Sequence, residues 1–354
     1  MIQRRIAIGH VFALLLGVCG GANAGTLPCR QPQLVTDGSM VYLACGAGDA
    51  VQIAVSSDGG RTFGSPTTIA TVGALALGAH RGPRVAVADH AVIVSAVVGS
   101  LGGGKDGDVV VWRSTDRGTS WSAPTRINDV PSSAREGLHA LAARGSKAVS
   151  AWLDLRTRGT KLYAAFSDDG GRTWGANVLV YESSSGTICE CCHPSLAIDA
   201  AGQVFAMFRN VVEGHRDFYL TSASDRRFTT PEKLGIGTWP LEACPMDGGA
   251  LLTDQVHGVT TVWRRDKTVY LARPGQREVP LAQGVNPSAV STAAGPVFAW
   301  SGAAGVTIAG PGGPPVVLDP RGSFVALANG PEGVVAAWES AGGSITRLLE
   351  PDRR

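Results

Sequence analysis

Short apolar segments recur along the whole chain, separated by turns rich in glycine, proline, aspartate and asparagine. Seven of these segments open a repeating unit, at residues 33–35, 83–87, 138–141, 194–198, 249–252, 287–290 and 323–326. Most are followed by a turn and a second apolar segment that carries Trp or Phe, as at residues 148–152. No long stretch has the periodicity of a helix. Short strands at regular spacing predict an all-β repeat protein.

A polar phrase occurs within this pattern at a nearly constant period. It stands at residues 57–63, 114–121 and 167–174, with a decayed copy near 222–228. Its aspartates, Asp58, Asp116, Asp169 and Asp225, follow one another at intervals of 58, 53 and 56 residues. A fixed period of this size indicates a repeat architecture. Units of about four strands around one axis form a β-propeller, and we expect six or seven blades, with seven favoured.

Each phrase also has the composition of a folding device. Its carboxylate can accept backbone N–H bonds, its glycine can adopt a conformation that other residues avoid, and its final aromatic ring can cover the blade edge. Three copies at this spacing resemble the Asp-box, or BNR repeat, of sialidases and related propellers, over roughly residues 30–235. The resemblance implies a sialidase-like propeller of the exported bacterial type.

Sialidases, to which the resemblance points, are retaining exo-glycosidases. They hold a substrate carboxylate with three arginines and use an aspartic acid/base with a tyrosine nucleophile that a glutamate activates. Carried over by motif, the arginine positions match Arg81, Arg209 and Arg216, and the acid/base position matches Asp106 or Asp108. The resemblance therefore implies a substrate-binding group and an acid/base at the mouth of the propeller.

The covalent part of that machinery departs from the family pattern. His193 stands where the activating glutamate belongs, and Asn286-Pro287-Ser288 stands where the family places Tyr-Ser. Arg84 competes with Arg81 for the position of the first arginine. These departures favour an inherited scaffold without standard sialidase catalysis, because a shared fold does not carry its function along.

Six cysteines follow residue 24. Cys29 and Cys45 flank the first strand and are predicted to form a disulfide in an oxidising compartment. Residues 189–193, Cys-Glu-Cys-Cys-His, lie just before one inner strand, and residues 244–246, Cys-Pro-Met, lie just before the next. Because adjacent inner strands meet near the axis, we expect these two loops to face each other at the mouth of the central channel.

This group allows more than one interpretation. Its soft donors would suit copper(I) or zinc, and they are Cys189, Cys191, Cys192, His193, Cys244 and Met246. In an exported chain the four cysteines could instead form structural disulfides, with three complete pairings available. A redox-active thiol pair is the third interpretation.

The N-terminal residues indicate the cellular compartment of the protein, and its net charge bears on which partners it can bind. Residues 1–24 have a basic start, an apolar core and a small-residue cleavage site, as in a secretory signal, so we expect a periplasmic or secreted protein. Removal of Arg4 and Arg5 takes the formal charge from +2 to zero, which disfavours nucleic acid as a partner. No later stretch is apolar enough to span a membrane.

These observations together predict an exported, monomeric sialidase-like propeller that binds a soft metal or a small anionic or glycan ligand at its axial mouth. Two alternatives stay open. One is a diverged exo-α-sialidase-like glycoside hydrolase with Asp106 or Asp108 as acid/base. The other is a scaffold for protein partners.

Overall fold

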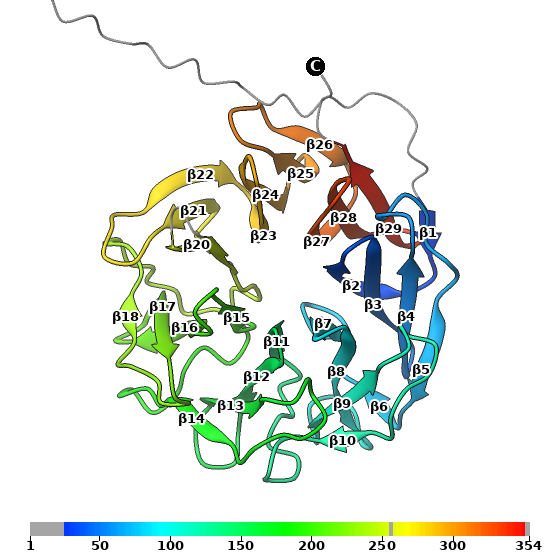
Figure 1. The fold of residues 1–354 in the computed structure, drawn as a ribbon. Coiled ribbons are helices and arrows are strands. Elements are labelled where there is room, and N and C mark those ends of the chain that lie inside the picture. The colour runs from blue at the N-terminus through cyan, green and yellow to red at the C-terminus, as the bar shows by residue number, and fades with distance from the viewer. Residues whose placement is uncertain (1–24, 255–257, 351–354) are drawn as a thin grey trace, which may run out of the picture.

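The computed structural model describes residues 25–254 and 258–350 and folds them into seven antiparallel sheets around a central axis (Figure 1). The chain is an all-β, seven-bladed propeller, so the favoured blade number is confirmed. The predicted signal, residues 1–24, lies outside the described residues. Within the described ranges, no helix is long and apolar enough to cross a membrane.

The first three blades in chain order hold the Asp-box phrases. The first contains β2 (Arg30–Asp37), β3 (Met40–Ala47), β4 (Ala50–Ser56) and β5 (Thr67–Thr71). The second contains β7 (Arg84–Ala88), β8 (Ala91–Gly99), β9 (Asp108–Ser114) and β10 (Thr125–Arg126), with β6 (Ala74–Leu75) also paired to β8. The third contains β11 (His139–Arg144), β12 (Lys147–Asp154), β13 (Lys161–Ser167) and β14 (Val178–Tyr181).

The next three blades repeat the same order without a complete Asp-box. The fourth contains β15 (Ser195–Ile198), β16 (Val204–Val212), β17 (His215–Ala223) and β18 (Glu232–Lys233). The fifth contains β19 (Ala250–Asp254), β20 (Gly258–Arg265), β21 (Thr268–Ala272) and β22 (Val279–Gln283). The sixth contains β23 (Val285–Thr292), β24 (Gly295–Gly302), β25 (Gly305–Ala309) and β26 (Val316–Asp319).

The seventh blade joins the two ends of the described chain. Its strands are β27 (Ser323–Gly330), β28 (Gly333–Ser340), β29 (Gly343–Leu349) and the N-terminal β1 (Gly25–Leu27). Strand β1 pairs antiparallel with β29, so the ring of blades is closed by backbone hydrogen bonds. Immediately after β1, Cys29 forms the predicted disulfide with Cys45 of β3, and this confirms the pairing.

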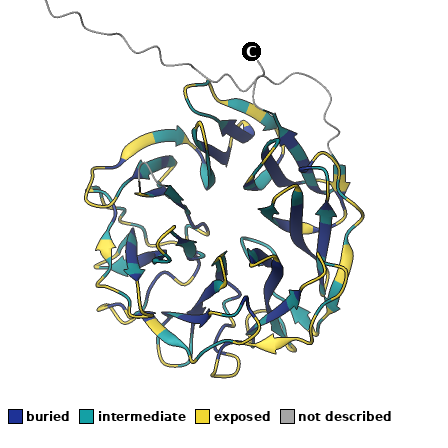
Figure 2. Ribbon diagram, viewed as in Figure 1, coloured by how far each residue is buried: buried dark blue, intermediate teal, exposed yellow. Residues whose placement is uncertain are grey.

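Burial follows the position of each strand within its blade. The second strands, such as β8 and β12, are buried along most of their length, whereas the outermost β5, β10 and β22 are largely exposed (Figure 2). A second strand is covered on both faces by the neighbouring blades, which explains its nearly continuous Val and Ala sequence. Most core clusters therefore lie between two blades.

The Asp-box turn connects the two outer strands of its blade. In the first blade Ser56 Oγ donates to Asp58 Oδ1 at 2.7 Å and accepts from the Gly60 N–H at 2.9 Å. Asp58 also accepts from the Thr62 N–H at 3.0 Å and the Thr62 hydroxyl at 2.6 Å. The same pattern recurs at Ser114 and Ser167. These aspartates stabilise turns at the rim of the propeller, at the side of each blade that lies away from the inner strand.

Candidate functional site

The inner strands of the blades surround an axial chamber of about 220 Å³. Its lining includes residues just before an inner strand or among the first residues of one, such as Gln31, His80, Arg84, His193, Asn286 and Phe324. Of these, Gln31, His80, Asn286 and Phe324 have positive φ angles of 54°, 68°, 52° and 53°, although none is a glycine. Non-glycine residues held in this region are strained and tend to occur at functional sites. The chamber is therefore a candidate ligand site.

Two histidines face each other in this chamber. The rings of His80 and His193 lie 4.7 Å apart between centroids, with an interplanar angle of 40°. His80 Nε2 donates to Asn286 Oδ1 at 2.8 Å, and His193 Nδ1 donates to the Pro194 carbonyl at 3.1 Å. Burial lowers the pKa of both imidazoles, and the charge of Arg84 lowers both further. Both rings are therefore neutral near pH 7.

Arg84, the first residue of β7, is buried beside these rings. Its guanidinium donates to the carbonyl oxygens of His139 and Gly82, each at 3.2 Å. It also donates to the carbonyls of Pro83 and His80, and no carboxylate pairs with it among the described residues. Burial lowers the pKa of Arg84 to about 10. The chamber wall thus carries one positive charge that only carbonyl dipoles compensate.

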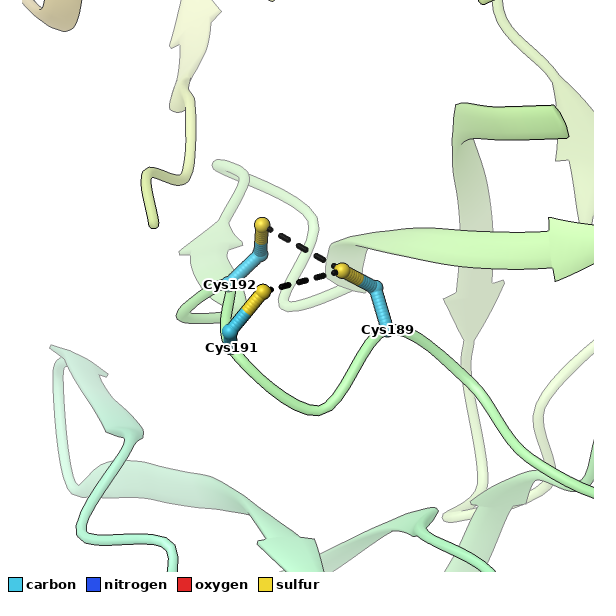
Figure 3. Close-up of side chains that lie close together, drawn as sticks. All are labelled: Cys189, Cys191 and Cys192. Atoms are coloured by element: carbon cyan, nitrogen blue, oxygen red, sulfur yellow. Dashed lines mark hydrogen bonds between the residues drawn. The ribbon is translucent and has the colours of Figure 1, made fainter. Parts of the chain in front are cut away.

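Three cysteines gather on the loop between β14 and β15 that leads into the chamber. Figure 3 shows Cys189, Cys191 and Cys192 pointing toward one another from this single loop. Cys189 Sγ lies 3.6 Å from Cys191 Sγ and 3.4 Å from Cys192 Sγ, and all three sulfurs lie within 4.8 Å of one another. All three side chains are buried free thiols. This group, called the cysteine cluster below, has the donors and the compactness of a metal site.

The cysteine cluster lies in a positively charged environment. Arg216 of β17 donates from Nη1 to Cys189 Sγ at 3.2 Å. Hydrogen bonding with Cys191 and Cys192 lowers the pKa of the Cys189 thiol, and the charge of Arg209 lowers it further. The hydrogen bond between Cys189 and Cys191 raises the pKa of the Cys191 thiol. Cys189 is therefore the first of the three to become a thiolate.

A buried ion-pair network supports the neighbouring loop. Arg209 of β16 is 1 % exposed and lies 3.0 Å from the carboxylate of Asp247, which is also 1 % exposed. Asp247 forms a second ion pair with Arg264 of β20. The Arg209 guanidinium lies over the rings of Phe218 at 4.1 Å and Trp239 at 5.0 Å. This network fixes the loop that enters β19 against the fourth blade.

The structure brings together only part of the six-residue metal set expected from the sequence. Among the described His, Cys, Asp and Glu residues, the compact group consists of the three cysteines alone, without His193 or Cys244. Cys244 is an exposed free thiol, and Met246 is 38 % exposed. The charges of Cys189 and Cys244 both raise the pKa of Arg216, so the loops that carry these two cysteines lie near each other.

The residues expected from the sialidase resemblance are engaged by protein groups. Asp106 accepts bonds from the N–H and hydroxyl of Ser100 at 2.7 and 2.8 Å. Asp108 accepts from Asn128 Nδ2 and from the Ser132 N–H, each at 2.7 Å. Both carboxylates therefore brace loops of the second blade, and their role as acid/base candidates stays a prediction.

The three candidate arginines are likewise bonded within the protein. Arg81 donates to the Glu136 carbonyl at 2.6 Å, whereas Arg209 pairs with Asp247 and Arg216 contacts Cys189. Their assignment to a substrate carboxylate also stays a prediction.

Two residues of this region have no recognisable signal in the sequence. Neither His80 nor Asp247 is assigned a role by the sequence patterns. The contacts of His80, and the contact of Asp247 with Arg209, come from other blades, so neighbouring residues in the sequence do not reveal them. His80 stands four residues before β7 and His193 two residues before β15, so the two do not hold corresponding places and the repeat does not relate them.

Comparisons with known proteins agree with this fold. The profile of the family described as BNR repeat-like domain matches residues 46–238. No curated protein matches the sequence. The intramolecular trans-sialidase from Ruminococcus gnavus is similar in structure, with a TM-score of 0.54 at 11% identity over 97% of this chain and 98% of that one.

Two further sialidases are similar over most of their length. The Hadza microbial sialidase Hz136 has a TM-score of 0.52 at 15% identity, over 86% of this chain and 74% of its own. The NanB sialidase from Streptococcus pneumoniae has a TM-score of 0.52 at 10% identity, over 92% of this chain and 68% of its own. At these identities the likeness concerns the fold alone.

Proposed function

Because the chain belongs to the BNR repeat-like family, with a sialidase-like propeller as its scaffold, we propose that it uses this scaffold to bind a soft metal ion, copper(I), at the cysteine cluster. The observation that carries the proposal is the convergence of three buried sulfurs within 4.8 Å of one another. Thiolate donors select soft ions such as Cu(I), and hard ions prefer oxygen.

The sulfur spacing supports a bound ion. A metal–sulfur bond of about 2.3 Å places the sulfurs of a trigonal site about 4 Å apart. Cys189 Sγ lies 3.6 and 3.4 Å from the other two sulfurs and all three lie within 4.8 Å of one another, so an ion at the centre requires shifts of less than about 1 Å. Arg216 lies against Cys189 and would offset part of the negative charge of a thiolate site.

The number of donors favours copper(I) over zinc. Structural zinc sites are almost always four-coordinate. The cluster supplies three sulfurs, and neither His193 nor Cys244 belongs to the same compact group in the described chain. Three thiolates satisfy Cu(I), which accepts trigonal coordination, but leave zinc one ligand short.

The test is an anaerobic titration of the reduced protein with Cu(I) held by a chromophoric chelator. We expect one sulfur-bound ion, with three sulfur neighbours in X-ray absorption, and loss of at least tenfold in affinity in Cys191→Ser. Cys244→Ser is the matched control, because it removes a free thiol outside the cluster. If thiol titration of the exported protein finds these cysteines paired and no metal is retained, the proposal is wrong.

We propose further that the exported protein does not carry out standard sialidase catalysis. Two departures support this: His193 stands where the family has its glutamate, and Asn286-Pro287-Ser288 stands where it has Tyr-Ser. The internal bonds of Arg209 and Asp106 support it as well. The disulfide between Cys29 and Cys45 supports an oxidising compartment. Release of a fluorescent phenol from a sialoside, abolished by Asp106→Asn, would overturn this proposal and favour the diverged glycosidase.

A glycan or small anion at the axial mouth is the second candidate ligand. The observation that favours it is the Arg84 guanidinium in the chamber wall, which has no carboxylate partner among the described residues. A glycan array with the metal-free protein tests this candidate. Binding that Arg84→Met abolishes would support it, and the absence of any bound glycan or acid would count against it.

A further inference from the structure

We propose that Cys244 and Met246 form an entry port through which copper(I) reaches and leaves the cysteine cluster. The proposal rests on the proposed function, because a port needs a metal site behind it. Its own basis is the exposure of these two soft donors, the contact of their loop with the cysteine cluster, and the bonds that fix this loop.

The cysteine cluster is almost closed to solvent. Cys189, Cys191 and Cys192 are 1, 7 and 2 % exposed, so a carrier cannot surround an ion held among them with sulfur ligands of its own. Cu(I) prefers thiolate and thioether ligands, and such an ion passes most easily from one soft ligand to the next. Loading of the cysteine cluster therefore calls for a further soft donor that a carrier can reach.

Two such donors stand together on the loop before β19. Among the described residues outside the cysteine cluster, Cys244 is the one free thiol, and it is exposed. Met246 is 38 % exposed, whereas Met207 is fully buried and Met40 packs against the core of the first two blades. The accessible thiol and the most accessible thioether of the described chain therefore lie two residues apart.

This loop contacts the cysteine cluster at its least buried member. A backbone hydrogen bond from Met246 reaches the thiol of Cys191, which is the most exposed of the three cysteines. Arg216 links the two loops, because it donates from Nη1 to Cys189 Sγ at 3.2 Å and from Nε to the Leu241 carbonyl at 3.0 Å. The loop that carries both exposed donors therefore lies against the Cys191 side of the cysteine cluster.

The loop is fixed on both sides of Met246. Arg264 donates to the Pro245 carbonyl at 2.8 Å, and the buried Asp247 carboxylate pairs with Arg209 and Arg264. These bonds hold the backbone beside the cysteine cluster before any ion arrives. A donor carried on such a fixed backbone is preorganised for transfer over a short distance.

The transfer is a ligand exchange without a redox step. Cys244 replaces one thiolate of a Cu(I)–thiolate carrier, and its proton leaves with the displaced thiol. Cys191 replaces the next ligand in the same way, and the ion enters the cysteine cluster as its bonds to Cys189 and Cys192 form. Copper stays copper(I) throughout. Because a port lowers the barrier equally in both directions, it changes the rates of loading and release but not the affinity.

The experiment separates rate from affinity. Reduced full-length protein is mixed anaerobically with Cu(I) bound to glutathione, and loading is followed by stopped-flow absorbance of the Cu(I)–thiolate band. In the double variant Cys244→Ser with Met246→Leu we expect loading to slow by about tenfold, while the affinity, measured against a chromophoric chelator, stays within about twofold of the wild type. Met40→Leu is the matched control, since Met40 packs in another part of the propeller, and it should load at the wild-type rate.

The outcomes distinguish this proposal from the proposed function. Loading of the double variant at the wild-type rate would overturn the port and leave the cysteine cluster standing as a copper site. A loss of affinity in Cys244→Ser as large as that in Cys191→Ser would also overturn the port, because Cys244 would then be a permanent ligand. If the wild type retains no sulfur-bound Cu(I), the proposed function is wrong and the port falls with it.

Discussion

At the rim of this propeller three blades each carry their own copy of one turn, whereas at the axis the chamber takes residues from every blade. The rim turn is satisfied within eight residues of chain, as Ser56, Asp58 and Thr62 illustrate. The axis depends on contacts between blades, such as that of Arg209 with Asp247. Local interactions can therefore be repeated and inherited as a unit, but an axial site changes one residue at a time while the fold persists.

This difference predicts that substitutions at the rim reduce stability without changing the ligand site, whereas substitutions near the axis change both. The decayed fourth phrase agrees with the first half of that statement. It has Ala223 in place of the serine and lacks the two glycines, yet β17 and β18 still form. One rim turn is thus dispensable to the propeller.

The largest effect is expected at Asp247. In Asp247→Ala the buried Arg209 loses its carboxylate, and breaking a buried pair in this way costs about 3–5 kcal/mol. Urea unfolding followed by tryptophan fluorescence measures the change. Asp225→Ala, at an exposed aspartate of the decayed rim phrase, is the control and should stay within about 0.5 kcal/mol. Equal losses in the two variants would remove the distinction between axis and rim.

A smaller effect is expected for Gly248→Ala. The added methyl group would lie 2.3 Å from His193 Nε2, so the ring must move, and overpacking of this kind costs about 1–3 kcal/mol. Gly342→Ala is the matched control, because its added methyl meets only Thr26 Cγ2 at 3.6 Å. Thermal unfolding and copper binding are measured on both. If Gly248→Ala were stable and bound copper as the wild type does, neither stability nor copper binding would depend on the position of the His193 ring.

The rim and the axis also differ in how far the sequence predicts them. The period of Asp58, Asp116 and Asp169 reports a local turn, and a local turn is encoded in adjacent residues, so the propeller and its seven blades followed from the pattern. The disulfide of Cys29 with Cys45 followed because the two cysteines flank one strand.

Only part of the axial site could be predicted from the sequence. The cysteine loop was recognisable because its donors are adjacent in the chain, and the structure gathers the three cysteines at 189, 191 and 192. The pairing of His80 with His193, and the buried Arg84, depend on how separate blades pack and on positive φ angles, which sequence patterns do not report. Cys244 lies outside the compact cluster, and its place in a metal site stays a prediction.

At the rim, Ser167→Ala should have a moderate cost. The serine is buried, and its hydroxyl accepts from the Gly171 N–H at 2.9 Å while donating to Asp169. Its loss leaves a buried N–H without an acceptor, which costs about 1–2 kcal/mol. Copper binding should be unchanged, since the turn lies on the outer strands. Ala223→Ser is the reciprocal control: it restores the serine in the decayed phrase, but Arg226 and Arg227 replace the two glycines of the turn, so it should gain little. A loss of copper in Ser167→Ala would contradict the separation of rim and axis.

The smallest effect is a pH dependence confined to the rim. Hydrogen bonds from Ser120 and Ser114 lower the pKa of Asp116 to about 2, from an ordinary value of 3.8. At Asp58 partial burial acts upward, but the bonds from Thr62 and Ser56 prevail and lower its pKa to about 2 as well. Between the ordinary and the lowered pKa the unfolded chain binds more protons than the folded one. The contribution of these carboxylates to the free energy of unfolding is therefore complete above about pH 5 and is lost as the pH falls toward 2.

Urea unfolding at pH 7, 5 and 3 measures how the free energy of unfolding changes with pH. Asp116→Asn should make this change shallower and lower stability slightly at pH 7. Because the carboxylate is open to water, solvent screening keeps the change small. A slope unchanged in Asp116→Asn would mean that the acid sensitivity of the fold arises elsewhere than in the rim turns.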